Sequence, residues 1–155
     1  MSNFLDLARK AEERAATFQG MASHPFTEAL SRKGEKGIYG LFEIGDQLEH
    51  AVYVGRTRNL AGRFRAHITP SHNSASFALK RTRIRHNLPT TYKAIGSRTA
   101  IVNEPITRAT FLDEIQKIKM MRFRFVEESD PVAQYLLELA VTMNYGLSLD
   151  GFDSH

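Results

Sequence analysis

The stretch YVGRTRNLAGRFRAH, residues 53–67, places four arginines behind a tyrosine and a glycine. Arg63 carries a planar guanidinium that can hold two phosphate oxygens at once. Gly55 has no Cβ, so a phosphate can come close to the backbone at this position. The plainer alternatives are a solvated helix arginine and the end of a strand. For Arg58 and Arg65 we favour a solvated surface that contributes electrostatic attraction.

A second chemically informative residue is Glu138, the only charged residue between Asp130 and Asp150. A carboxylate held near apolar side chains needs a cation or hydrogen-bond partners. A single hard oxygen ligand suits Mg²⁺ when water and a substrate phosphate fill the other positions. The alternative is that Gln134, Glu138 and Thr142, spaced by four, form the wet side of an amphipathic helix.

Two tyrosines stand in short patterns, Tyr39 at the end of GIY and Tyr53 at the start of YVG. A phenol with a pKa of about 10 is a poor base at neutral pH. Nearby guanidinium groups and a metal favour the phenolate. Spacing alone favours two cross-strand aromatics in a half-buried hairpin. Gly55 and Arg63, which follow in series, favour a catalytic role for the two tyrosines over a purely structural one.

The charge of the chain is segregated along the sequence. The span from His50 to Asn103 holds ten of the 21 Lys and Arg residues and none of the 17 Asp and Glu residues. Such segregation costs self-repulsion, which a polyanionic partner relieves. A solvated basic cluster is the alternative. The residues predicted to contact nucleic acid are Arg56, Arg58, Arg65, Lys80, Arg81, Arg83 and Arg85.

A small α+β domain must position these residues. Asp130 as N-cap and Pro131 at the first helical position mark the start of the last helix. The order of elements predicts a small, mostly antiparallel sheet flanked by helices, with an extra N-terminal helix. Hydrophobic periodicity predicts helices over 3–18, 59–67, 74–86, 107–121 and 129–143, and strands over 37–44, 50–55 and 122–128.

The ordered set of GIY, YVG, a basic helix with Arg63, and Glu138 resembles the GIY-YIG nuclease family. The resemblance is close over residues 37–67 and looser over 122–153. It implies a GIY-YIG-like domain over 37–155, with 1–36 as a helix and linker packed on its core. It also implies a metal-dependent endonuclease that hydrolyses phosphodiester bonds, with double-stranded DNA as the expected substrate.

The resemblance also implies roles for single residues. Tyr39 and Tyr53 would stand side by side and flank the attacking water, with Tyr39 as general base. Arg63 would contact the scissile phosphate, and His67 sits where many members have tyrosine. Glu138 would bind one divalent cation, Mg²⁺ or Mn²⁺.

Two departures from the family pattern affect these expectations. Thirteen residues separate Tyr39 from Tyr53, slightly more than is usual, which predicts an extended hairpin turn. Asp150 stands where the family has an asparagine, and Asn144 is only half as far from the glutamate. A catalytically inactive nucleic-acid-binding module on the same scaffold is therefore the alternative, and a protein-interaction domain is a more remote one.

The composition narrows the class of protein. The chain has no cysteine, which excludes disulfides and thiolate chemistry. Its charged N-terminus does not resemble a signal peptide, and no apolar run approaches the ~20 residues that cross a bilayer. We expect a cytoplasmic protein. No P-loop or dinucleotide fingerprint is present, so we expect no small-molecule cofactor.

Overall fold

The computed structural model describes residues 3–91 and 96–149. The chain forms two compact units. Unit 1 comprises Met1–Ala61 and Met121–His155, and unit 2 comprises Gly62–Met120. The predicted division at residue 37 falls inside unit 1, because the N-terminal helix and the sheet share one core.

Unit 1 is built on a four-stranded antiparallel sheet, which confirms the predicted α+β class. The strand order is β1-β4-β2-β3, so β3 lies at an edge. The strands are β1 (His24–Pro25), β2 (Gly37–Gly45), β3 (Leu48–Thr57) and β4 (Arg122–Glu127). Only β1 was not predicted, because two residues are too few to show an alternating pattern.

The β2–β3 hairpin closes through a tight turn. Asp46 and Gln47 connect the strands with φ angles of 49° and 68°, the left-handed values that a two-residue type I′ turn requires. The prediction of an extended turn is therefore wrong. The additional residues lengthen both strands, and a bulge at Leu41/Phe42 absorbs one more.

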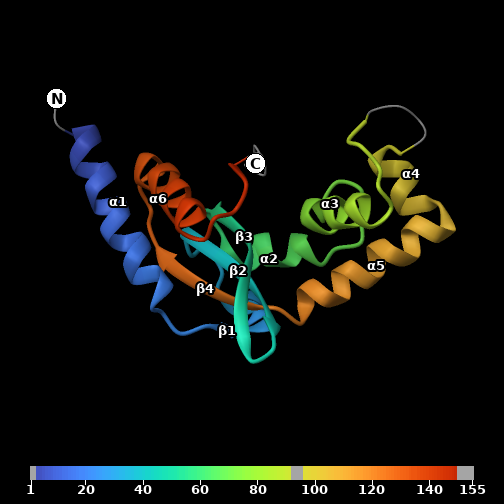
Figure 1. The fold of residues 1–155 in the computed structure, drawn as a ribbon, viewed down its shortest axis with the longest axis horizontal. Helices are drawn as coiled ribbons and strands as arrows, with labels where there is room; N and C mark the ends of the chain where they lie inside the picture. Colours follow the sequence, from blue (N-terminus) through green and yellow to red (C-terminus); the bar gives the residue numbers. More distant parts are fainter. Residues whose placement is uncertain (1–2, 92–95, 150–155) are drawn as a thin grey trace. The chain divides into compact units, whose positions relative to one another are not determined.

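Two helices cover one face of this sheet. α1 (Asn3–Gln19) and α6 (Pro131–Asn144) lie side by side (Figure 1) and pack on the sheet through a shared apolar cluster. The buried members of this apolar cluster are Ala15, Phe18, Ile38, Phe42, Leu137 and Val141. A short 3₁₀ helix, η1 (Phe26–Ser31), follows β1.

The first amides of α6 and α2 (Leu60–His67) are satisfied in different ways. Asp130 Oδ2 accepts a hydrogen bond from the Ala133 amide at 2.9 Å, and Pro131 occupies the first turn of α6 as predicted. At α2, the side chain of Asn59 instead accepts from the Gly34 amide at 2.9 Å. The first two amides of α2 donate to loop carbonyls, those of Glu35 and Arg32.

Unit 2 is helical and contains α3 (Ser76–Arg85), α4 (Arg98–Asn103) and α5 (Pro105–Lys119). Hydrophobic periodicity predicts no element over α4, which Ser97 caps by accepting from the Ala100 amide. Phe77 of α3 is 6% exposed and belongs to the core of unit 2. Among residues 3–91 and 96–149, no helix has the length and apolar character needed to span a membrane.

Candidate functional site

Tyr39 and Tyr53 stack on each other in unit 1. Their ring centroids are 5.9 Å apart and their planes differ by 28°. Tyr39 lies opposite Gly55 in the ladder and Tyr53 opposite Leu41, so the rings are diagonal neighbours. Tyr39 is fully buried, whereas Tyr53 is half-buried. The hairpin thus brings the two predicted phenols together and leaves Tyr53 the more accessible one.

Gly55 makes room for this pair. A Cβ at Gly55 would lie 2.8 Å from the Tyr39 hydroxyl oxygen and 3.0 Å from Cε1 of Tyr53. Real side chains do not show contacts that close. The space above Gly55, expected to admit a phosphate, is therefore filled by the tyrosine pair. Glycine is needed here so that both phenols can close over the strand.

The polar stripe of α6 is buried. Gln134, Glu138 and Thr142 have exposed fractions of 2%, 2% and 3%. The interpretation of this stripe as the wet side of the helix is wrong. The exposed residues of α6 are instead mostly apolar: Val132, Tyr135, Leu139 and Met143.

Each buried polar side chain of the stripe has a hydrogen-bond partner within unit 1. Gln134 Nε2 donates to the Thr57 carbonyl at 3.2 Å, and Thr142 Oγ1 donates to the Glu138 carbonyl at 2.7 Å. The carboxylate of Glu138 accepts from Arg56. These contacts remove the cost of burying polar groups next to apolar neighbours.

Arg56 joins the edge strand to α6. Its Nη1 lies 2.8 Å from Oε1 of Glu138, and the two side chains are 17% and 3% exposed. The same guanidinium lies over the ring of Tyr135, with Cζ 4.0 Å from the ring centroid. Arg56, predicted only as a nucleic-acid contact, is thus the cationic partner of the candidate metal ligand.

The tyrosine pair and the Arg56–Glu138 pair lie on opposite sides of β3. Side chains alternate along a strand, so Tyr53 and Gly55 share one face and Val54 and Arg56 share the other. Val54 packs on the α1/α6 cluster, which places Arg56 on the α6 side. The sequence already indicates this arrangement, because residues 53 and 56 are an odd number of positions apart on one strand and therefore point to opposite faces. Because β3 is an edge strand, Tyr53 and Arg56 both lie at the border of the sheet, on its two faces.

The carboxylate oxygens of Glu138 are ligands of the kind that hard divalent cations prefer. Within residues 3–91 and 96–149, no three His, Asp or Glu side chains gather to form a metal site. Glu138 offers one carboxylate, and Mg²⁺ or Mn²⁺ completes such a site with water and phosphate oxygens. Asp150, which stands at the family's asparagine position, lies outside the described residues.

Arg63 and His67 belong to unit 2. Arg63 is half-buried on α2. His67 is 2% exposed, and its ring meets the rings of Phe64 and Phe77 edge-on, with centroids 6.1 Å and 6.3 Å away. The structure therefore packs His67 among aromatic side chains in unit 2.

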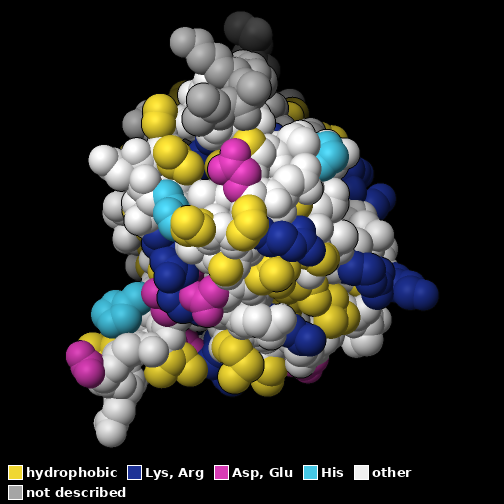
Figure 2. All heavy atoms as spheres, turned by 90° about the vertical axis from the view of Figure 1, so that its right-hand side faces the viewer, with side chains coloured by type: hydrophobic (Ala, Val, Ile, Leu, Met, Phe, Trp, Pro, Cys, Tyr) yellow, Lys and Arg dark blue, Asp and Glu magenta, His cyan; other side chains and the backbone are white. Residues whose placement is uncertain are grey.

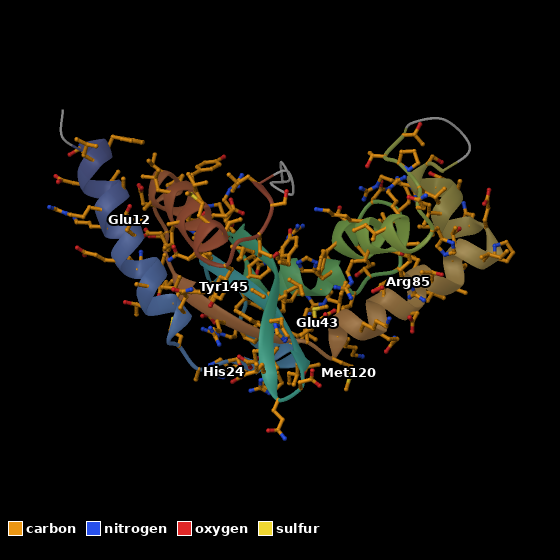
Figure 3. The ribbon with its side chains drawn as sticks, viewed as in Figure 1. Glu12, His24, Glu43, Arg85, Met120 and Tyr145 are labelled. Atoms are coloured by element: carbon orange, nitrogen blue, oxygen red, sulfur yellow. The ribbon has the colours of Figure 1, made fainter. Side chains whose placement is uncertain are left out.

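The arginines of α3 are used within unit 2. Arg81 Nε pairs with Oε1 of the buried Glu114 at 2.8 Å. Arg85, labelled in Figure 3, pairs with Asp113 at 2.7 Å. Arg83 is 8% exposed, and its Nη1 donates to the carbonyls of Pro89 and Gly96. Burial lowers the pKa of Arg83, and repulsion from Arg98 adds to this shift. These side chains hold the unit together.

Other predicted nucleic-acid contacts do lie at the surface. Arg65 and Lys80 are exposed in unit 2, and Arg58 is exposed in unit 1, where its Nη1 lies 3.3 Å from the Ser129 carbonyl. Lys and Arg side chains reach the surface at several separate places, interspersed with hydrophobic ones (Figure 2). Arg65 and Lys80 are thus the best candidates for contacting a polyanion.

Compared with protein-family models, with curated proteins and with solved structures, the chain has no match. A function for this protein therefore has to be argued from its own residues and their geometry.

Proposed function

We propose that this protein is a metal-dependent endonuclease of the GIY-YIG type that hydrolyses DNA phosphodiester bonds. The observation that carries the proposal is that β3 holds both parts of the candidate site in unit 1: Tyr53, stacked on Tyr39, on one face, and Arg56, which binds the buried Glu138, on the other. Tyr39 and Tyr53 close over Gly55. Arg56, three residues after Tyr53, holds Glu138.

Hydrolysis requires a positioned water, a group that accepts its proton, and positive charge near the phosphate. In the proposal Tyr53 contacts the attacking water, because it is the less buried phenol. Tyr39 lies fully buried beneath it and orients its ring. The role of general base, first predicted for Tyr39, thus passes to Tyr53.

Glu138 would hold the divalent cation through its carboxylate. A bound Mg²⁺ or Mn²⁺ supplies Lewis-acid stabilisation of the charge that develops on the phosphate and the leaving oxygen. The contact of Arg63, in unit 2, with a scissile phosphate stays a prediction from the sequence.

Nucleic-acid binding is assigned mainly to unit 2. This unit carries eleven of the 21 basic residues and three of the 17 acidic ones. Contacts from lysine and arginine to phosphates give affinity with little sequence information, and they weaken as salt rises. Arg65 and Lys80 are the exposed members proposed to make them.

The test is a nicking assay on supercoiled plasmid with Mg²⁺ or Mn²⁺. Wild type should nick, and Glu138→Gln should lose about 100-fold or more of the rate while still retarding DNA in a gel. Glu12→Gln, on the exposed surface of α1, is the matched control and should nick like wild type. Wild-type nicking rates in Glu138→Gln would contradict the proposed metal ligand.

A nucleic-acid-binding module is the second candidate. The observation in its favour is that Tyr39 is fully buried and that the tyrosines face away from the α6 side of β3. The same assay separates the two candidates. DNA retardation without nicking by the wild type, with either metal, supports the binding module.

A further inference from the structure

Arg56 lies between two side chains of α6. Its Nη1 contacts the carboxylate of Glu138 at 2.8 Å, and its Cζ lies 4.0 Å from the ring centroid of Tyr135. Tyr135 and Glu138 are three residues apart and therefore neighbours on one turn of the helix. One guanidinium thus bridges a buried anion and a more exposed aromatic ring.

Glu138 and Tyr135 hold Arg56 for different physical reasons. The Glu138 side chain is 3% exposed, and a carboxylate so deeply buried needs a cationic partner to remain charged. Tyr135 is 53% exposed and attracts the guanidinium through its ring face. The ring can keep Arg56 in place even when another cation holds the carboxylate.

We infer that Arg56 is a displaceable counterion that competes with a divalent cation for Glu138. The inference rests on the proposed function, since it takes Glu138 as the metal ligand. A positive charge at hydrogen-bond distance from the carboxylate repels a second cation there. Metal binding in the absence of DNA is therefore weakened by Arg56.

A substrate phosphate would relieve this competition. Its oxygens can accept the donors of Arg56, which stays on Tyr135 while the carboxylate turns to the metal. DNA and metal then strengthen each other's binding, and this coupling is reciprocal. Arg56 would thus link metal loading to the presence of substrate.

The experiment is a calorimetric titration of the full chain with Mn²⁺, without DNA. Arg56→Gln keeps a hydrogen-bond donor for Glu138 but removes the charge, so it should bind Mn²⁺ at least about tenfold more tightly than wild type. Arg56→Lys keeps the charge and should bind like wild type. Arg58→Gln removes the same charge two residues away and is the matched control, expected to change affinity little.

Thermal unfolding gives a second measurement that does not depend on activity. Mn²⁺ should raise the unfolding midpoint of Arg56→Gln more than that of wild type, because the buried carboxylate gains a cationic partner. Adding Glu138→Gln to Arg56→Gln should remove both effects. This readout also applies if the variant folds poorly without metal.

These measurements distinguish a failure of the proposed competition from a failure of the proposed metal site. If Glu138→Gln abolishes Mn²⁺ binding but Arg56→Gln binds no more tightly than wild type, the competition is refuted and the proposed metal site stands. If Glu138→Gln binds Mn²⁺ like wild type, the metal site of the proposed function is refuted, and the competition with it.

Discussion

Gly55 shows how a single residue type can decide whether a site forms. In the sequence it reads as a strand end or as a place where phosphate comes close. In the structure its missing Cβ lets Tyr39 and Tyr53 stack over β3. The contact depends on the diagonal register between two strands, which residue types alone do not specify.

Gly55→Ala should therefore disturb the tyrosine pair. The added methyl would lie 2.8 Å from the hydroxyl of a fully buried tyrosine, which has little room to move. We expect a loss of about 1–3 kcal/mol in the free energy of unfolding and a loss of nicking. Urea unfolding provides the measurement.

Gly45→Ala is the matched control for this variant. It lies on the same hairpin, and its added Cβ would meet only His50, at 3.5 Å. It should unfold close to wild type. Equal stability of the two variants would mean that the tyrosines can shift aside at little cost.

Glu138 shows what residue spacing leaves open. The spacing of Gln134, Glu138 and Thr142 places them on one face of a helix, but periodicity does not say which face is buried. Both the buried and the exposed face of α6 carry apolar residues, so hydrophobicity does not identify the face that is buried. Partners distant in sequence decide the matter: Arg56 and the Thr57 carbonyl lie on β3.

At the level of elements, long periodic segments were predictable. The hairpin strands, α1, α2, α3, α5, β4 and α6 all lie close to their predicted ranges. Two short elements, α4 and β1, were not. The six residues of α4 are too few for a clear period, although Ser97 was a readable cap, and β1 forms only by pairing with β4. The turn length was predicted wrongly because the additional residues between Tyr39 and Tyr53 lengthen the two strands.

A polar network ties β3 to β4 across the sheet. Glu49 of β3 accepts from Ser23 and, at 2.9 Å, from Nη2 of Arg124, while Arg122 lies 3.4 Å away. Burial alone would raise the pKa of Glu49. The hydrogen bonds from Ser23 and Arg124, with the charges of Arg124 and Arg122, outweigh it and lower the pKa below its usual 4.5.

Glu49 should therefore make stability depend on pH. A lowered folded-state pKa gives a contribution that is complete above the unfolded value of about 4.5 and is lost as pH falls through the folded value. Glu49→Gln should lower the free energy of unfolding by about 1 kcal/mol at neutral pH. Unfolding measured near pH 7 and pH 3 should show this difference shrinking in acid. A difference that stays constant would mean that the charge of Glu49 contributes nothing.

For the whole molecule, charge separates between the two units. Unit 2 has eleven basic and three acidic residues, whereas unit 1 has ten and fourteen. The sequence shows the basic span but not how much of it is used internally. Arg81 and Arg85 meet Glu114 and Asp113, about thirty residues further along the chain, and Arg83 holds backbone carbonyls. The surface available to DNA is therefore smaller than the basic span predicts.

In the proposed reaction, the tyrosines on one side of β3 and Glu138 on the other act on the same phosphate. The measurement is the single-turnover rate of plasmid cleavage by wild type, Tyr53→Phe, Glu138→Asp and the double variant, all at saturating DNA and Mn²⁺. Each single variant should slow cleavage, and the double variant should be no slower than the slower single one, because groups that act as a unit are not additive. Wild-type cleavage by Tyr53→Phe, or losses that multiply in the double variant, would contradict a shared site.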